Sequence, residues 1–443
     1  MKNFEKEYLS LSWPLIGQSL LHIVMQQIDL MMVAQLGTAS VASVGLVNAY
    51  FFVFFMFFIA LGFGVFSLMT QLHGDGNLKS LGKLTSSALT VSFIVGLLLW
   101  VIFIKGLEIF LVLWNVELSV VEVSRLYAKG LGPSLPFLAC IVVLESALRS
   151  CGLTSEEFRL KILATLINIL LNFILIFGFF GFPAMGEFGA GLATSLARIF
   201  TVIILLRLFF TRALDFNIKW QWLFTFNQNL WEKVLQFSGI LLFQDILWAI
   251  AILAYSRAFS EMGTEVLAVY NVMYLMDCMA DAFCMGFTWS AGIIIGRDLG
   301  QSKFNRVWVR SQVMLRICLK YSFLIITGLA IISPLILLFY PFDAYQEGLY
   351  WGMFCIHGVI FPLKMIGMIL MVGALRSGGD YLSAALIELG GMYLFSVPLA
   401  LIAALSWHWG PFMVFSIISS EWILKTAFIW WRYNQKVWLR KLI

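Results

Sequence analysis

Long apolar runs follow one another along almost the whole chain. Each has the roughly 20 residues that an α-helix needs to cross the hydrocarbon core of a bilayer. No alternation of apolar and polar residues with a period of two persists, as a β-barrel would require. The sequence therefore predicts an all-α integral membrane protein with about twelve transmembrane helices. The runs lie near 12–34, 46–70, 84–105, 126–148, 160–181, 188–210, 234–257, 267–295, 312–333, 350–374, 382–405 and 410–431.

Composition supports this prediction and argues against other classes of protein. Hydrophobic residues make up 61% of the chain and charged residues only 12%, about half the charged share of a soluble protein. The 6 Cys and 4 His show no metal-ligand spacing, and no nucleophile or phosphate-binding motif is present. The N-terminal residues lack the small-residue cleavage site of a removable signal peptide. We expect neither an enzyme nor a protein with a bound cofactor or a nucleic-acid partner.

Positive charges are divided unequally between the two sides of the predicted spans. If the N-terminus lies inside, the outer loops contain only Lys105, Arg125 and Arg257, while most other Lys and Arg residues lie inside. Positively charged loops stay preferentially in the cytoplasm. We therefore expect a multi-pass protein of the cytoplasmic (inner) membrane with both termini in the cytoplasm, which an even number of spans also requires.

The two halves of the chain repeat each other. Ala147–Gly152 reads A-L-R-S-C-G, Ala374–Gly379 reads A-L-R-S-G-G 227 residues later, and Gln18 meets Gln244 at an offset of 226. The repeat predicts two pseudo-symmetric six-helix lobes of equal orientation, related by an axis along the membrane normal, with the substrate path between them. The predicted parts are the N-lobe at 1–212, a cytoplasmic connecting loop at 213–228 and the C-lobe at 229–443.

The first apolar run contains a solitary carboxylate, Asp29, and no cationic residue occurs between Lys6 and Lys79. An ionised Asp near the middle of a bilayer costs about 2.5–3.5 kcal/mol on insertion scales. Such a residue is paired, protonated or exposed to a water-filled cavity, and the nearby sequence offers no partner. We interpret Asp29 as the ion or proton site of a transporter. The alternative is a carboxylate that is hydrogen-bonded inside a helical bundle for structural reasons.

Two amides and a hydroxyl follow in the same half of the chain. Asn168 and Asn172 are four residues apart and so share one helical face, and Thr194 lies in the next span. Together with Asp29, these groups can supply the oxygen ligands of a small cation such as Na⁺, or the hydrogen-bond shell of a protonatable acid. Interhelical hydrogen bonding would explain each residue taken singly.

Further charges lie in the predicted spans of the second half. Asp277 and Asp281, four residues apart, repel each other if both are ionised, and a buried Lys364 would neutralise one of them. A functional site and a structural Lys–Asp pair that lets the helices insert both remain open. The candidate polar cluster of the C-lobe consists of Gln244, Asp245, Asp277, Asp281 and Lys364, with Glu388 in the following span.

The second predicted span is unusually aromatic between Tyr50 and Phe58. Phe side chains against lipid are the commoner explanation. Rings that face a cavity would instead suit flat organic cations through stacking and cation–π contacts. The candidate residues of such a substrate cavity are Gln18, Tyr50, Phe54 and Phe58.

Several of these features together resemble the multidrug and toxic compound extrusion (MATE) family of secondary transporters over nearly the whole chain. They are Pro14 fifteen residues before Asp29, the N-I-L-L-N segment at 168–172, the Gly-rich segment that ends at Thr194, and the repeated A-L-R-S-x-G element. The resemblance implies twelve helices in two lobes and export of organic cations against inward H⁺ or Na⁺. It assigns the coupling site of the N-lobe to Asp29, Asn168, Asn172 and Thr194.

The chain departs from one bacterial branch of that family in its C-lobe. That branch has a Glu in the seventh span and an Asp in the tenth, where this chain has Gln244 and Met365 beside Asp245 and Lys364. Coupling through Asp29 is therefore the expectation, in a monomer whose partners are small organic cations and the lipid bilayer. The alternative function is a lipid-linked oligosaccharide flippase of the same superfamily, which would need a strongly cationic cavity.

Overall fold

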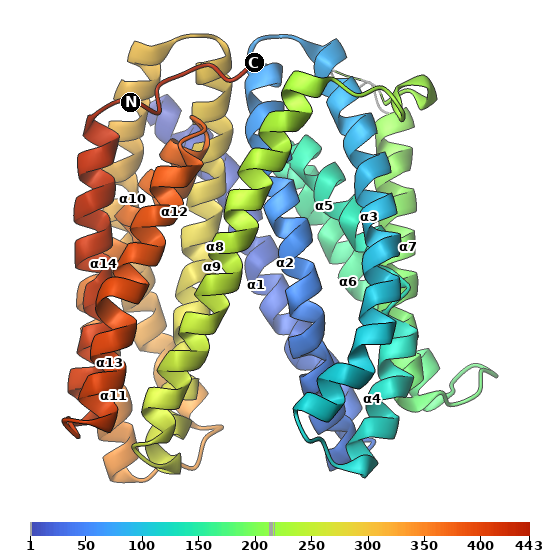
Figure 1. Ribbon diagram of the computed structural model, residues 1–443, viewed down its shortest axis with the longest axis vertical. Helices are drawn as coiled ribbons and strands as arrows, with labels where there is room; N and C mark the ends of the chain where they lie inside the picture. The colour runs from blue at the N-terminus through green and yellow to red at the C-terminus, as the bar shows by residue number, and fades with distance from the viewer. Residues whose placement is uncertain (1, 212–215, 217) are drawn as a thin grey trace. The chain divides into compact units, whose positions relative to one another are not determined.

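The computed structural model describes residues 2–211, 216 and 218–443, and these residues form helices and connecting segments without a β-strand. Residues 212–215 and 217, part of the expected N-lobe end and connecting loop, lie outside the described residues. The helices of the first half are α1 (Lys2–Ala34), α2 (Thr38–Gly74), α3 (Leu78–Leu113), α4 (Leu118–Leu131), α5 (Ser134–Ser150), α6 (Thr154–Phe177) and α7 (Gly186–Thr211) (Figure 1).

A short 3₁₀ helix, η1 (Trp220–Trp222), lies in the segment that leads to the second half. The α-helices that follow are α8 (Gln228–Ser260), α9 (Thr264–Gly300), α10 (Phe304–Leu337), α11 (Ala344–Met368), α12 (Tyr381–Gly390), α13 (Val397–Leu405) and α14 (Pro411–Asn434). Two π-helical stretches, η2 (Ile369–Arg376) and η3 (Gly391–Ser396), continue α11 and α12. Such stretches are rare and occur often at functional sites.

The predicted all-α membrane architecture is confirmed. Among the described residues, ten helices are long and apolar enough to cross a membrane, and α4 with α5, bent by 47°, can form an eleventh span. Gly132 and Pro133 lie at this bend, where proline cannot continue a helical hydrogen-bond ladder. Helix α1, 33 residues long, is not among the ten, because polar side chains such as Gln18, His22 and Asp29 interrupt its apolar run. The described residues thus offer ten or eleven candidate spans, against the about twelve expected from the sequence.

The chain divides into two compact units. The N-terminal unit is Leu20–Gly239, and the C-terminal unit combines Met1–Ser19 with Ile240–Leu442. Both divisions fall inside long helices, α1 and α8, whose two ends pack in different units. The start of α1 is held by the hydroxyl of Tyr8, which donates to the carbonyl of Phe287 at 2.8 Å. These divisions differ from the expected limits at 212 and 229, because a repeat in sequence does not reveal which helix ends pack together.

Close helix crossings in the N-terminal unit occur at residues without bulky side chains. A Cβ on Gly130 of α4 would lie 2.5 Å from the carbonyl oxygen of Phe188, and one on Gly191 of α7 would lie 2.4 Å from that of Tyr127. Small residues of this kind let helix backbones approach closely in membranes. Ser195 Oγ adds a hydrogen bond of 2.6 Å to the Gly130 carbonyl. This crossing fixes the positions of Tyr127 and Thr194.

Candidate functional site

The structure brings Asp29 of α1 together with the two predicted amides of α6. Asn172 Nδ2 donates a hydrogen bond of 2.7 Å to Asp29 Oδ1 and one of 3.2 Å to Asn168 Oδ1. Asn168 and Asn172 are only 1% and 2% exposed. Of the two amides expected to face Asp29, Asn172 contacts it directly, and Asn168 is linked to it through Asn172. We call these three residues the Asp29 site.

Two polar atoms of the Asp29 site have no hydrogen-bond partner among the described residues. They are Asn168 Nδ2 and Asn172 Oδ1, and both are buried. A buried polar atom without a partner costs about 1–3 kcal/mol, so such atoms are uncommon unless they have a role. Thr194 does not complete the site, because its hydroxyl donates to the carbonyl of Ala190 at 3.2 Å in its own helix.

Arg198 adds a cation that the sequence analysis missed. It lies one helical turn after Thr194 on α7 and interacts electrostatically with Asp29, although no ion-pair contact joins the two described side chains. Its Nη1 donates to Ser134 Oγ at 2.6 Å, and its guanidinium lies 4.9 Å from the ring centroid of Phe51. An Arg in the middle of the apolar run 188–210 was the signal that could have identified it.

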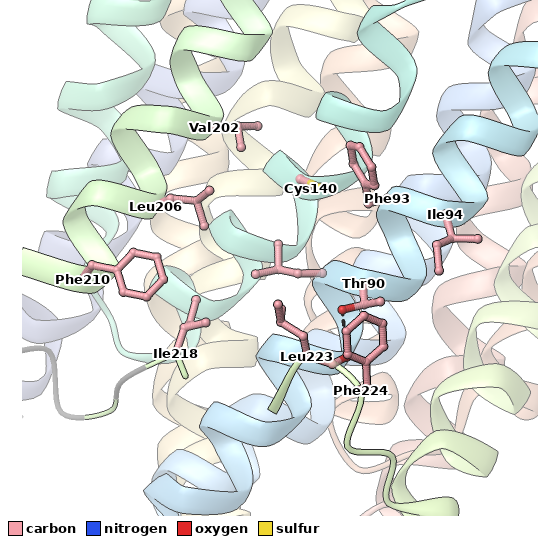
Figure 2. Close-up of a pocket in the computed structure, with 11 residues that line it drawn as sticks. Thr90, Phe93, Ile94, Cys140, Val202, Leu206, Phe210, Ile218, Leu223 and Phe224 are labelled. Carbon is pink, nitrogen blue, oxygen red and sulfur yellow. Dashed lines mark hydrogen bonds between the residues drawn. The ribbon is translucent and has the colours of Figure 1, made fainter. Parts of the chain in front are cut away.

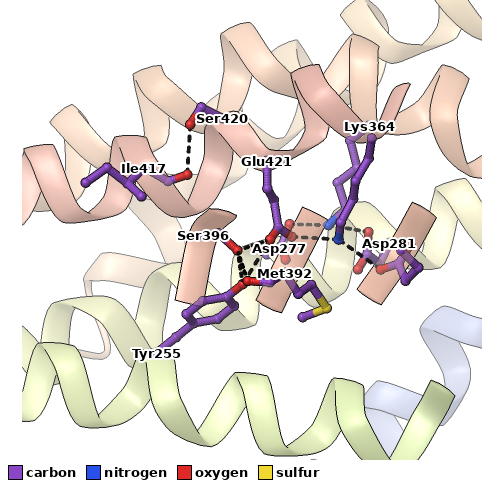
Figure 3. A network of polar contacts seen from close by, with 11 residues as sticks. Tyr255, Asp277, Asp281, Lys364, Met392, Ser396, Ile417, Ser420 and Glu421 are labelled. Atoms are coloured by element: carbon purple, nitrogen blue, oxygen red, sulfur yellow. Dashed lines mark hydrogen bonds and ion pairs between the residues drawn. The ribbon is translucent and has the colours of Figure 1, made fainter. Parts of the chain in front are cut away.

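A second charged group lies in the C-terminal unit, on α9 and α11. Lys364 Nζ is 2.7 Å from Asp277 Oδ1, to which it donates a hydrogen bond. It is also 2.7 Å from Asp281 Oδ1, in an ion pair that lacks hydrogen-bond geometry. The predicted pairing of Lys364 with these Asp residues is therefore confirmed (Figure 3). Buried His357 lies beside them, with Nδ1 3.5 Å from Asp277 Oδ1. We call Asp277, Lys364 and Asp281 the Lys364 triad.

A neighbouring triad, also of one lysine and two carboxylates, joins α12 and α14. Lys425 Nζ lies 3.0 Å from Glu388 Oε1 and 2.9 Å from Glu421 Oε1, and these three residues form the Lys425 triad. Glu421 Oε2 accepts hydrogen bonds from Tyr255, at 2.9 Å, and from Ser396 of η3 (Figure 3). The ring of Trp422 is near both lysines, with centroid distances of 5.8 Å to the Lys364 Nζ and 4.8 Å to the Lys425 Nζ.

The other C-lobe candidates lie around Arg376. Gln244 Oε1 accepts a hydrogen bond of 3.3 Å from Arg376 Nη2. Asp245 interacts electrostatically with Arg376 and with Glu388. Met365, which stands where an Asp was expected, is fully buried. The polar cluster predicted for the C-lobe thus contains an arginine and a second lysine triad that the prediction did not include.

The aromatic substrate candidates are packed into the core of the N-terminal unit. Phe54 is 6% and Phe58 1% exposed, and both belong to the apolar core between α2, α3, α4 and α5. Tyr50 stacks on Phe103 and Phe110 with centroid distances of 5.2 and 4.7 Å. These rings present little free surface to a ligand in this structure. Gln18 is buried in the C-terminal unit.

The N-terminal unit also contains an apolar pocket of about 390 Å³ (Figure 2). It lies between α3, α5, α7 and the segment after α7, and the hydroxyl of Thr90 in its wall donates to the carbonyl of Leu223 at 2.8 Å. No residue of the Asp29 site lines this pocket. Among the described residues, no group of three or more His, Cys, Asp or Glu side chains could hold a metal ion.

Carboxylates and cations are buried inside the candidate spans of this multi-pass membrane protein. The family model MatE matches residues 14–174. Over these residues the chain is similar to the multidrug and toxic compound extrusion (MATE) family.

Relatives match along most of the chain. The probable multidrug resistance protein YoeA of Bacillus subtilis is 26% identical over 88% of this chain and 84% of its own. The uncharacterized transporter YisQ of the same organism is 21% identical over 98% of this chain and 94% of its own. The bent form of the MATE transporter VcmN of Vibrio cholerae has the same fold, with a TM-score of 0.88 and 18% identity over 98% of this chain and 97% of its own.

Proposed function

We propose that this protein exports organic cations in exchange for inward protons, with Asp29 as the coupling residue. The observation that carries the proposal is the hydrogen bond of 2.7 Å from Asn172 to Asp29, a carboxylate inside the spans that has no ion pair among the described residues. A proton and an organic cation can each neutralise this carboxylate, so they compete for it. The names of relatives such as the probable multidrug resistance protein YoeA support drug-like cations as the substrate class.

Two features favour a proton over Na⁺ as the coupling ion. Asn172 directs its NH₂ group, a hydrogen-bond donor, toward the carboxylate, whereas a Na⁺ site requires oxygens that converge on the ion. The positive charge of Arg198 acts on the same carboxylate and therefore repels an approaching Na⁺ ion. A proton requires no coordination shell and needs only the carboxylate oxygen.

The proposal places the protein in the cytoplasmic (inner) membrane with both termini in the cytoplasm, as a monomer. The distribution of Lys and Arg between the loops supports this orientation. The buried charges of the C-terminal unit support a cationic substrate over a lipid-linked pyrophosphate. Each of its two triads has two carboxylates for one lysine, so the region attracts cations.

Transport into inverted membrane vesicles tests this function. Cells should produce the wild-type protein or the Asp29→Asn variant at matched levels, and respiration should energise the vesicles. We expect wild-type vesicles to accumulate a fluorescent organic cation and Asp29→Asn vesicles to accumulate none. Asn inserts at least as easily as Asp, so expression provides the control for folding. Normal accumulation by a well-expressed Asp29→Asn protein would reject the proposal, as would transport of a lipid-linked oligosaccharide without cation transport.

A further inference from the structure

The Lys364 triad contains one more negative charge than positive charge. Its two carboxylates share one ammonium group, and Lys364 Nζ is 2.7 Å from an oxygen of each. All three residues lie within spans, where an uncompensated charge is costly. A further cation is therefore needed beside this lysine. A proton, which binds directly to a carboxylate oxygen, is the simplest cation that meets this need.

The two carboxylates of the triad are not equivalent. Asp277 receives the hydrogen bond from Lys364 and also contacts His357 Nδ1 at 3.5 Å. Asp281 has only the ion pair, and its Oδ1 makes no hydrogen bond. Lys364 therefore pairs best with Asp277. The ionised form of Asp281 is the less stabilised of the two carboxylates. The side chain of Asp281 is 36% exposed, so protons can reach it.

The groups around the triad increase the demand for a cation. Asp281 interacts electrostatically with Glu388 of the Lys425 triad, which also has one excess negative charge. Glu388 Oε2 is buried without a hydrogen-bond partner. His357 is 6% exposed, and its Nε2 likewise has no partner among the described residues. Together these groups form a region of negative potential within the spans of the C-terminal unit.

The remaining charged groups of this region do not remove the excess. The region contains five carboxylates, those of Asp245, Asp277, Asp281, Glu388 and Glu421, against three cationic side chains, those of Lys364, Arg376 and Lys425. Cys278 and Cys284 also interact electrostatically with Asp281 and are neutral as thiols. Two negative charges therefore remain unbalanced if every acid is ionised.

We propose that Asp281 is a second proton-exchange site and that the protein moves two protons inward for each monovalent organic cation exported. This inference rests on the proposed function, because it adds a proton to the exchange at Asp29. In the loaded state the proton is on the Asp281 carboxylate. When the proton leaves for the aqueous phase, Lys364 shares its charge between Asp281 and Asp277, which limits the cost of the ionised state.

The second proton changes how membrane voltage acts on transport. Two protons against one monovalent cation move one net positive charge inward per cycle. At zero voltage, one pH unit then supports about 100-fold accumulation, because each proton contributes about tenfold. At zero pH gradient, 100 mV supports about 50-fold accumulation, because one elementary charge gains about 2.3 kcal/mol. With one proton per cycle, one pH unit supports about tenfold accumulation, and voltage alone supports none.

Purified protein in liposomes can distinguish the two cases. The pH gradient and the voltage, set with K⁺ and valinomycin, should be varied separately while the accumulation of a permanently charged monovalent cation is measured. We expect the wild type to show about 100-fold accumulation per pH unit and a clear response to voltage. Asp281→Asn, which mimics the protonated acid, should show about tenfold accumulation and no response to voltage. Proton release on addition of the cation to detergent-solubilised protein should fall from two per cation to one.

Glu347→Gln provides the matched control. It removes one exposed carboxylate at the start of α11 and leaves both triads intact. We expect this variant to keep the voltage response and the release of two protons. A wild type without voltage response, or an Asp281→Asn protein that still releases two protons, would overturn the inference. Asp29→Asn separates the two proposals, because full accumulation by that variant rejects the proposed function whatever Asp281 does.

Discussion

At the scale of single residues, the proposed coupling at Asp29 depends on the charges around this carboxylate. Asn172 contributes a donor to the carboxylate, and Arg198 contributes a positive charge from α7. The guanidinium is itself held by Ser134 and by the ring of Phe51. A fixed cation that is anchored in this way neutralises part of the carboxylate's charge without occupying the site, so a proton can still bind.

Arg198→Gln tests this role. Removal of the fixed positive charge should let Na⁺ approach Asp29, so we expect Na⁺ to inhibit pH-driven efflux in the variant. Wild-type efflux should be the same in Na⁺ and in choline buffers. Arg207→Gln is a matched control, because Arg207 lies on the same helix with an exposed side chain. If Na⁺ affects the wild type and Arg198→Gln equally, Arg198 does not select against Na⁺.

Lys364→Met tests the Lys364 triad. The variant leaves Asp277 and Asp281 without their cation, and unpairing a buried charge costs about 3–5 kcal/mol. We expect a lower thermal midpoint in detergent or a lower yield. The double variant Lys364→Met with Asp277→Asn has the same net charge as the wild type and should recover part of the loss. Equal stability of the single variant and the wild type would show that the lysine is not needed to balance these acids.

Some site residues could be predicted from the sequence because a charge in an apolar run stands out. Asp29 and the pairing of Lys364 with Asp277 and Asp281 follow from that cost alone. Arg198 shows the same signal in the run 188–210, but its interaction with Asp29 depends on how α7 packs against α1. That Glu388 joins the Lys425 triad could not be predicted, because it depends on how α12 packs against α14.

At the scale of helices, the crossing of α4 and α7 positions Tyr127, Thr194 and Arg198. Tyr127 donates to Asn48 Oδ1 at 3.1 Å and interacts electrostatically with Asp29. The crossing is tight because backbone atoms of one helix lie where a side chain on Gly130 or Gly191 would begin. Helix crossings of this kind depend on glycine rather than on apolar burial.

Gly130→Ala should therefore be costly although it adds only one methyl group. The new Cβ would lie 2.5 Å from the Phe188 carbonyl, and backbone cannot move aside without shifting a helix. We expect a loss of about 1–3 kcal/mol, measured as thermal stability in detergent, together with weaker transport. Gly328→Ala is the control: no atom lies within 4 Å of its Cβ, and Ala is the better helix former by about 1 kcal/mol. Equal stability of the Gly130→Ala and Gly328→Ala proteins would show that the close approach of α4 and α7 does not require glycine at position 130.

That the chain is built from long apolar helices could be predicted, because each apolar run had the length of a span. Local helix geometry could not. The π-helical stretches Ile369–Arg376 and Gly391–Ser396 have no signature in hydrophobic period, since they arise where the chain packs against neighbouring helices. The division of α1 and α8 between two units was also hidden, because a single helix gives one continuous apolar pattern wherever its two ends pack.

At the scale of the whole molecule, the central claim is that a pH gradient drives export through Asp29. In the proposed exchange a proton replaces the organic cation on the carboxylate, so each pH unit contributes about 1.4 kcal/mol for every proton that crosses. The test must therefore impose a proton gradient alone, with no Na⁺ present and no membrane voltage.

The most direct measurement uses purified protein in liposomes. The voltage is clamped at zero with K⁺ and valinomycin, Na⁺ is absent, and a pH gradient of one unit is imposed. The accumulation of a fluorescent organic cation is then followed for the wild type and for Asp29→Asn. The account predicts at least tenfold accumulation by the wild type and none by Asp29→Asn. Accumulation that requires Na⁺, or that persists unchanged in the Asp29→Asn protein, would contradict it.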